Sequence, residues 1–239
     1  MISDNKIWMY WNDGLENAPK SVQLCINSWK VQNKNYEVVV LEDNTISEWI
    51  DIPKFQDTVM TIQAFSNILR IFLLSKYGGI WADATLWCTK PVDGWVDNYS
   101  DDFFVFSNPT DSRMIASWFV KSSKDNIILK EWKDRVIDYI ENTKVVINNF
   151  WFHGLFEKIY NENIDVKNQW DSVLKYDVNR NNRVLENPLY FSKITDDDLD
   201  DLDDDFKFGV LNKTSPMYKL GWTINWLDTK KVKFLMSRY

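Results

Sequence analysis

Residues 64–85, AFSNILRIFLLSKYGGIWADAT, contain the most informative pattern of the sequence. Apolar side chains recur at helical spacing from about residue 61 to residue 77, which predicts an amphipathic helix. Three polar side chains, Ser66, Asn67 and Arg70, leave the neighbouring face of this helix together. The sequence therefore predicts a helix that carries a row of polar groups beside its apolar face.

An acidic residue follows this helix in an apolar strand. Gly78-Gly79 suits a helix end that needs positive φ, and the next residues alternate with Trp81, Asp83 and Thr85 on one face. Burying an unpaired carboxylate is costly, so we expect a partner such as an arginine or a metal ion. One interpretation is an ion pair between Asp83 and Arg70 that joins helix to strand. The other is a functional site.

The first forty residues predict a strand, a helix and a second strand. The strands are expected at residues 6–10 and 36–41, with a helix from Pro19 to about Asn33 between them, which implies a right-handed parallel crossover. In open α/β sheets, ligands bind outside the carboxyl ends of the strands. The loop residues that follow both strands should therefore border the same crevice as the acidic residue.

The rest of the chain predicts more strands and helices. Strands are expected at 103–106 and 114–120, and amphipathic helices at about 127–140 and 147–160. The second helix holds His153, the only histidine, and a lone histidine among aromatic residues is more often a packing residue than a catalyst. A length of 239 residues suits one large α/β domain.

Composition narrows the classes of partner. The 13 Trp, 14 Phe and 10 Tyr exceed ordinary use; such an excess often lines sugar or base sites, although core packing accounts for most of it. Eight aspartates between Asp196 and Asp205 explain the net charge of −7, which would be +1 without them. This run predicts a solvated surface loop, and nucleic acid is not expected as a partner.

Cellular location is predicted from what the sequence lacks. It shows no signal peptide and no apolar stretch of about 20 residues, so we expect a cytoplasmic protein. Cys25 and Cys88 read as small buried residues rather than a disulfide. The basic residues of 230–238 lie among apolar ones, which fits a packed helix with a basic outer face or a peripheral contact with the inner face of the membrane.

The central motif resembles a known signature. Ser66-Asn67-Ile68-Leu69-Arg70, Tyr77-Gly78-Gly79 and Asp83-Ala84-Thr85 are similar to the helix, Gly-Gly and strand pattern of retaining glycosyltransferases with a GT-A fold, in particular the capsular polysaccharide synthesis family with its DXD sugar-nucleotide site. The likeness covers roughly Lys6 to Val92 and, in patches, the last third. It implies one α/β GT-A domain over 1–239 with a mixed central sheet, in which about 1–95 bind the nucleotide and about 96–239 form the acceptor side.

The resemblance also implies roles for individual residues. Asp83 would ligate Mn²⁺ or Mg²⁺ bridging the donor diphosphate, and Arg70 would bind donor oxygens or orient Asp83. Trp8 would stack on the uracil, with a sheet-core tryptophan as an equal alternative. Lys219, in a segment similar to the family's closing loop, would stabilise the leaving diphosphate, although a solvated lysine is the default for any single Lys. The implied catalytic residues are Asp83 and Arg70, and the implied donor-binding residues are Trp8, Ser66, Asn67, Arg70, Asp83, Thr85 and Lys219.

Two positions depart from the family pattern. Asn67 stands where an Asp is usual, and Thr85 replaces the second Asp of DXD, so metal affinity is expected to be modest. The expected function is retaining transfer of galactose or glucose from a UDP-sugar to a lipid-linked or free saccharide in bacterial capsular or surface polysaccharide synthesis. One alternative is a non-catalytic sugar- or nucleotide-binding module, and another is an interaction protein that uses the acidic run.

Overall fold

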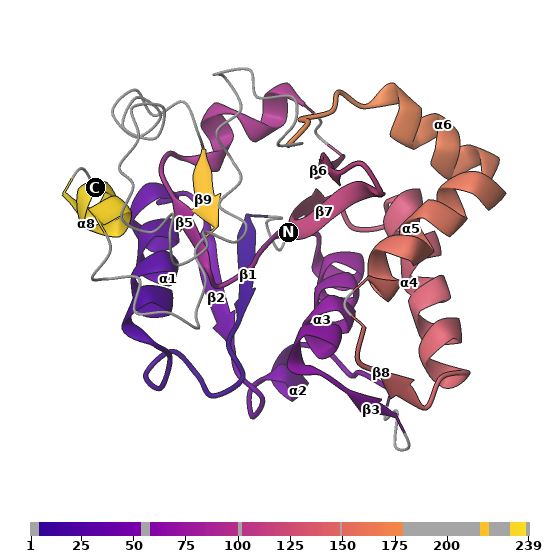
Figure 1. The fold of residues 1–239 in the computed structure, drawn as a ribbon, viewed down its shortest axis with the longest axis horizontal. Coiled ribbons are helices and arrows are strands. Elements are labelled where there is room, and N and C mark those ends of the chain that lie inside the picture. Colours follow the sequence, from indigo (N-terminus) through magenta and orange to yellow (C-terminus); the bar gives the residue numbers. More distant parts are fainter. Residues whose placement is uncertain are drawn as a thin grey trace.

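A five-stranded mixed sheet lies at the centre of the protein (Figure 1), with strand order β2-β1-β4-β7-β6. The computed structural model describes residues 5–53, 58–99, 102–148, 150–178, 216–219 and 230–237. The first block is β1 (Lys6–Tyr10), α1 (Lys20–Gln32) and β2 (Glu37–Leu41), and β1 pairs with β2 in parallel. The predicted strand, helix and parallel strand are therefore confirmed.

The remaining elements complete a mixed α/β fold. They are α2 (Ile46–Trp49), β3 (Val59–Met60), α3 (Ile62–Tyr77), β4 (Gly79–Ala82), β5 (Leu86–Cys88), two 3-10 turns (Val92–Gly94 and Val96–Asn98), β6 (Phe103–Thr110), β7 (Arg113–Ser122), α4 (Ile127–Glu141), β8 (Val145–Val146), α5 (Trp151–Glu162), α6 (Ile164–Ser172), β9 (Met217–Lys219) and α8 (Lys230–Met236). β4 is parallel to β1 but antiparallel to β7, and β7 is antiparallel to β6. The predicted α/β class with a mixed central sheet is confirmed.

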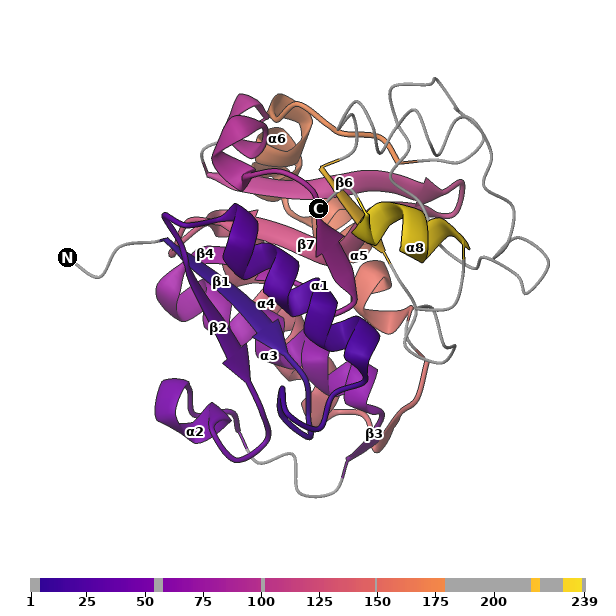
Figure 2. The same cartoon turned by 90° about the vertical axis from the view of Figure 1, so that its left-hand side faces the viewer.

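Alternation along the strands divides the core between the two faces of the sheet. Ile7 and Met9 of β1 point to the α1 side, whereas Trp8 and Tyr10 point to the side covered by α3 and α4. Figure 2 shows α1 over one face and α3 and α4 behind the other. Much of the aromatic excess lies in these two clusters, including Trp95 against Phe104 and Phe106 of β6 and Phe119 of β7. Core packing thus accounts for these residues, as expected.

Local sequence explains how α3 begins and ends. Thr61 caps the start, because its side-chain oxygen accepts a hydrogen bond from the backbone N–H of Ala64. At the end, Gly78 adopts φ 67° and ψ −160°, a conformation that is essentially restricted to glycine. The backbone N–H of Gly78 donates to the carbonyl oxygen of Leu74 at 2.8 Å. The chain therefore turns directly from α3 into β4.

Replacing Gly78 with alanine is expected to destabilise the protein by at least about 2 kcal/mol. A Cβ there would lie 2.9 Å from the backbone nitrogen of Lys124, in addition to the strain of positive φ. Gly154→Ala is the matched control, because Gly154 lies within α5 with no atom within 4 Å of a new Cβ, and alanine should stabilise the helix by about 0.5–1 kcal/mol. Urea unfolding of both variants measures these opposite signs, and equal effects would contradict the prediction.

Some predicted boundaries move. α5 begins at Trp151 rather than near 147, and β6 extends to Thr110.

Cys25 and Cys88 are buried free thiols, as expected. The acidic run at 196–205 lies outside the described residues. Within the described ranges, no helix combines the length and apolar character needed to cross a membrane.

Candidate functional site

The predicted strand through Asp83 and Thr85 is interrupted by a turn. β4 ends at Ala82 and β5 begins at Leu86, and the backbone N–H of Leu86 donates to the carbonyl oxygen of Asp83 at 2.9 Å. The backbone N–H of Asp83 donates to Trp118 of β7 at 2.9 Å. Asp83 is thus held at the carboxyl end of β4, where its side chain leaves the sheet. Thr85 lies half-buried in the same turn, not on the same strand face as predicted.

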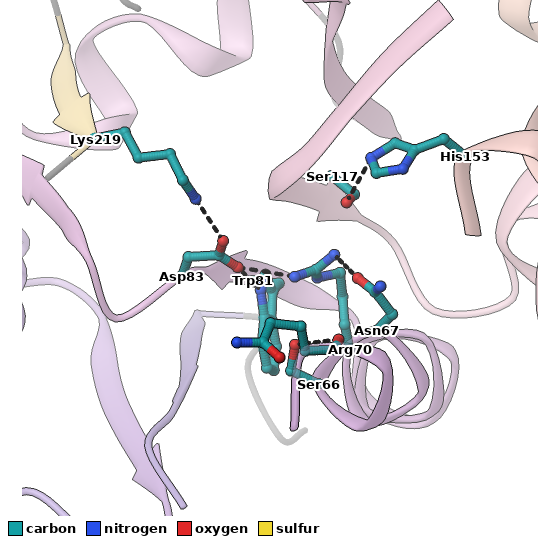
Figure 3. A network of polar contacts seen from close by, with 9 residues as sticks. Ser66, Asn67, Arg70, Trp81, Asp83, Ser117, His153 and Lys219 are labelled. Carbon is teal, nitrogen blue, oxygen red and sulfur yellow. Dashed lines mark hydrogen bonds and ion pairs between the residues drawn. The ribbon is translucent and has the colours of Figure 1, made fainter. Parts of the chain in front are cut away.

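Asp83 is the centre of a network that draws on three separate parts of the chain (Figure 3). Its Oδ1 accepts hydrogen bonds from Arg70 Nη2 at 2.8 Å and from Trp81 Nε1 at 2.9 Å. Its Oδ2 accepts one from Lys219 Nζ at 2.8 Å. Both oxygens of the carboxylate are therefore engaged, and two of the three donors are cations.

Arg70 is buried on the protein side of the Asp83 carboxylate, away from solvent. Its side chain is only 3% exposed, and its guanidinium lies 4.9 Å from the ring centre of Trp81 and 5.7 Å from that of Phe152. Nη1 donates to Asn67 Oδ1 at 2.7 Å while Nη2 bonds Asp83. Of its two predicted roles, this geometry favours orienting Asp83 over binding donor oxygens. The contacts thus match the second of the two roles that the resemblance implied for Arg70, and donor binding by this residue stays a prediction.

Lys219 reaches Asp83 from 136 positions further along the chain. It belongs to β9, which pairs antiparallel with β5, and in this register Lys219 lies opposite Leu86. Leu86 closes the turn that begins at Asp83, so the strand pairing brings the lysine to the carboxylate. The Lys219 and Asp83 side chains are 28% and 25% exposed, so both remain accessible to solvent. The predicted proximity of Lys219 to the site is confirmed.

The charges of the network favour an anion. Burial disfavours the charged form of Asp83, but Lys219 and then Arg70 outweigh this and hold the pKa of its carboxyl below the usual range. The carboxylate is therefore ionised at neutral pH. One negative and two positive charges leave a net charge of +1 on these three side chains, and Lys219 is the more accessible of the two cations.

The same contacts test the predicted metal ligand. A divalent ion at Asp83 needs free oxygen lone pairs and benefits from further acidic ligands. Here both Asp83 oxygens accept bonds from cationic or indole donors, and no group of three or more His, Cys, Asp or Glu suitable for a metal occurs among the described residues. As arranged, these residues do not fit Mn²⁺ or Mg²⁺.

The other predicted donor-binding residues lie on α3, which carries Ser66 and Asn67, and on β1, which carries Trp8. Asn67 is buried and directed at Arg70, while Ser66 is half-buried and its hydroxyl donates to the backbone oxygen of Gln63 at 2.9 Å. Trp8 is fully buried, with its Nε1 donating to the carbonyl oxygen of Gly78 at 3.0 Å. No face of its indole is open to a base. The structure therefore corrects the uracil-stacking prediction in favour of a sheet-core tryptophan.

The hydrogen bond that Trp81 Nε1 donates to Asp83 was not predicted from the sequence. The alternation that placed Trp81 and Asp83 on one strand face was the signal that relates them. The chain segments that follow β1 and β2 lie against each other, because the backbone N–H of Trp11 donates to the carbonyl oxygen of Leu41 at 3.0 Å and the hydroxyl of Tyr10 donates to Asp43 at 2.6 Å. That these segments border the same crevice as Asp83 stays a prediction.

His153 has a polar partner on the central sheet. Its Nε2 lies 3.1 Å from Ser117 Oγ of β7, a pair that Figure 3 shows above Asn67 and Arg70. The lone histidine is thus a hydrogen-bonded residue packed among aromatic rings, as expected. Its serine partner carried no signal in the sequence.

Comparisons with known proteins place the chain in a family. It is 24% identical over 154 residues to the "O-glycosyltransferase braB" of Annulohypoxylon truncatum, covering 55% of this chain and 37% of that protein. It is also 24% identical over 150 residues to the "Glycosyltransferase afumC" of Aspergillus fumigatus, covering 54% of this chain and 38% of that protein. The matches thus span well under half of these two fungal relatives. The solved structure of "PaToxG Glycosyltransferase" gives a TM-score of 0.48 at 19% identity over 70% of this chain and 74% of that one.

A family profile gives the broadest match. The profile described as "Capsular polysaccharide synthesis protein" matches residues 1–239, the whole of this sequence. The chain therefore belongs to the capsular polysaccharide synthesis protein family.

Proposed function

We propose that this protein is a retaining glycosyltransferase that transfers a hexose, galactose or glucose, from a UDP-sugar to a saccharide acceptor. The observation that carries the proposal is the network at the end of β4, in which an accessible lysine and a buried arginine share Asp83. A nucleotide-sugar donor presents a diphosphate, and a site with a net positive charge is suited to that group. Family membership and the two glycosyltransferase relatives support the reaction class.

The reaction requires charge to be stabilised on the leaving group. The bond between the anomeric carbon and the β-phosphate oxygen breaks, and its electron pair passes to that oxygen. The acceptor hydroxyl oxygen forms the new bond to the anomeric carbon, and its proton passes to the departing phosphate. In this proposal the Lys219 ammonium lies beside the developing negative charge, which lowers the barrier. Both Asp83 oxygens are already bonded, so the proposed retention uses attack on the same face rather than Asp83 as a nucleophile.

The acceptor in this proposal is a lipid-linked or free saccharide of a bacterial capsular or surface polysaccharide. The family description supports this context. A lipid-linked acceptor would bring the protein to the inner face of the cell membrane. Lys230 and Lys233 of the short α8 helix are exposed and basic, as a peripheral contact with anionic lipids would need.

Release of UDP from a panel of UDP-hexoses and UDP-N-acetylhexosamines tests the proposed function. We expect slow hydrolysis of one UDP-hexose, because water substitutes poorly for the acceptor hydroxyl, and faster release when saccharide acceptors are added. Anomer-resolved NMR of the product then reports retention or inversion. UDP binding by calorimetry without turnover of any donor, with or without saccharides, would instead favour the non-catalytic binding module. Absence of UDP binding in all buffers would contradict the proposal.

A further inference from the structure

We propose that Lys219 supplies the positive charge that binds the donor diphosphate, and that UDP binds this site without a divalent metal ion. The inference rests on the proposed function and deepens it. It turns on the contacts of Asp83, the residue for which the sequence predicted a metal. In the folded chain, that carboxylate is already neutralised by the protein itself.

The Asp83 carboxylate has little capacity left for a metal. A carboxylate offers about four lone-pair positions, and three N–H donors from Arg70, Trp81 and Lys219 already use three of them. A divalent ion would also have to approach between two cationic groups that each lie 2.8 Å from the same side chain. Like charges at such distances repel strongly in a partly buried setting. The described residues therefore favour an ammonium over a metal ion at this carboxylate.

Lys219 is the cation of the pair that a ligand can reach. Arg70 is 3% exposed and both of its terminal nitrogens are bonded within the protein, whereas Lys219 is 28% exposed. An ammonium group has three N–H donors, and the bond to Asp83 uses one of them. The other donors are the groups that phosphate oxygens would accept from. A lysine is a common point-charge binder of phosphate.

The pairing of β9 with β5 fixes the position of the Lys219 ammonium group beside Asp83. β9 pairs with β5 through Leu86↔Lys219, Trp87↔Tyr218 and Cys88↔Met217, so the lysine cannot slip by one residue without reversing its direction. Met217 and Tyr218 are each 1% exposed, which anchors the strand. Asp83 then serves to orient the ammonium. Its cationic partners are thus built from the chain rather than recruited from solution.

Calorimetry with UDP as the probe tests the inference in two buffers, one containing EDTA and one containing MnCl₂. For the wild type we expect the dissociation constants in the two buffers to agree within about twofold, because the binding charge belongs to the protein. Lys219→Met should weaken UDP binding in EDTA by about tenfold or more, and Lys219→Arg should recover much of it. Lys167→Met is the control, since Lys167 pairs with Asp171 on the surface of α6 and should leave binding unchanged.

A second readout uses the metal alone. Titration of Mn²⁺ followed by electron paramagnetic resonance should show no stoichiometric binding to the wild type at ion concentrations near those of the protein. UDP binding that requires Mn²⁺ would overturn the inference while leaving the proposed function intact, and so would stoichiometric Mn²⁺ binding that Asp83→Ala abolishes. Absence of UDP binding in both buffers would overturn the proposed function and the inference with it. The wild-type comparison decides the question even if Lys219→Met fails to fold.

Discussion

Asp83→Asn is expected to reduce UDP release about 100-fold or more and to lower the free energy of unfolding by about 3 kcal/mol. The amide has nearly the shape of the carboxylate but carries no charge, and its NH₂ group cannot accept the bonds that Asp83 accepts. Arg70, 3% exposed, would then keep a buried charge without its anionic partner. Removing one partner of a buried ion pair costs about 3–5 kcal/mol. We take the lower figure because Asp83 is 25% exposed.

Asp97→Asn is the matched control for this prediction. Asp97 makes the same kind of ion pair, with Lys121, but its side chain is 47% exposed and lies outside the network. An exposed pair contributes about 0–1 kcal/mol, so this variant should resemble the wild type in both urea unfolding and UDP release. Equal stability losses in the two variants would contradict the assignment of Asp83 to a buried network.

The pH dependence of stability gives a further check on Asp83. Lys219 and Arg70 hold the pKa of the folded carboxyl below its usual value against the opposing effect of burial. Its contribution is therefore present above the usual carboxyl pKa and is lost as the pH falls through the lowered value. Asp83→Asn lacks this group, so its unfolding free energy should fall less steeply in acid than that of the wild type.

Arg70→Met is expected to destabilise the protein by about 3–5 kcal/mol, the largest loss of stability among these variants. Methionine can fill part of the space between Trp81 and Phe152 but removes the bonds to Asn67 and Asp83. These contacts join α3 to β4 and α5, so their loss affects three elements at once. Urea unfolding measures the effect.

Arg135→Met is the control for Arg70, because Arg135 pairs with Glu162 at 36% exposure and should cost no more than about 1 kcal/mol. Turnover and UDP-affinity measurements on Arg70→Met show whether Arg70 positions Asp83 or contacts UDP itself. Where the Arg70→Met protein remains folded, turnover should fall while UDP affinity changes less than in Lys219→Met. Loss of UDP affinity as large as that of Lys219→Met would mean that Arg70 contacts the ligand directly.

Local patterns predicted most of the secondary structure. The 3.6-residue spacing before Gly78 is a property of neighbouring residues, and α3 follows it from Ile62 to Tyr77. Gly78 stops the helix because its backbone conformation suits almost no other residue. The boundary of α5 was missed because apolar residues before Trp151 continue the helical spacing. Two of these, Ile147 and Phe150, are exposed, so their hydrophobicity does not mark a buried helix face.

Part of the site is also local in origin. Asn67 and Arg70 are three residues apart on one helix, and Trp81 and Asp83 are two apart at the end of one strand, so sequence spacing brings each pair together. The pairing of Arg70 with Asp83 follows because a 13-residue separation spans only the end of α3 and the whole of β4. Local sequence was therefore sufficient to predict the α3 helix, the glycine turn after it and the parallel crossover, and it offered the Asp83–Arg70 pair as one of two interpretations.

The burial of Trp8 and the contact between Lys219 and Asp83 could not be predicted from local patterns, because burial and long-range register are properties of the packed chain. The sequence around Trp8 fits a core residue and a base-stacking residue equally well. Packing against Trp49 of α2 and Tyr77 of α3 is what buries the Trp8 side chain. Nothing near Lys219 in the sequence indicates Asp83, and the pairing of β9 with β5 alone brought them to 2.8 Å. Asp83, which the sequence predicted as a metal ligand, therefore bonds two cationic side chains of the protein, Lys219 and Arg70.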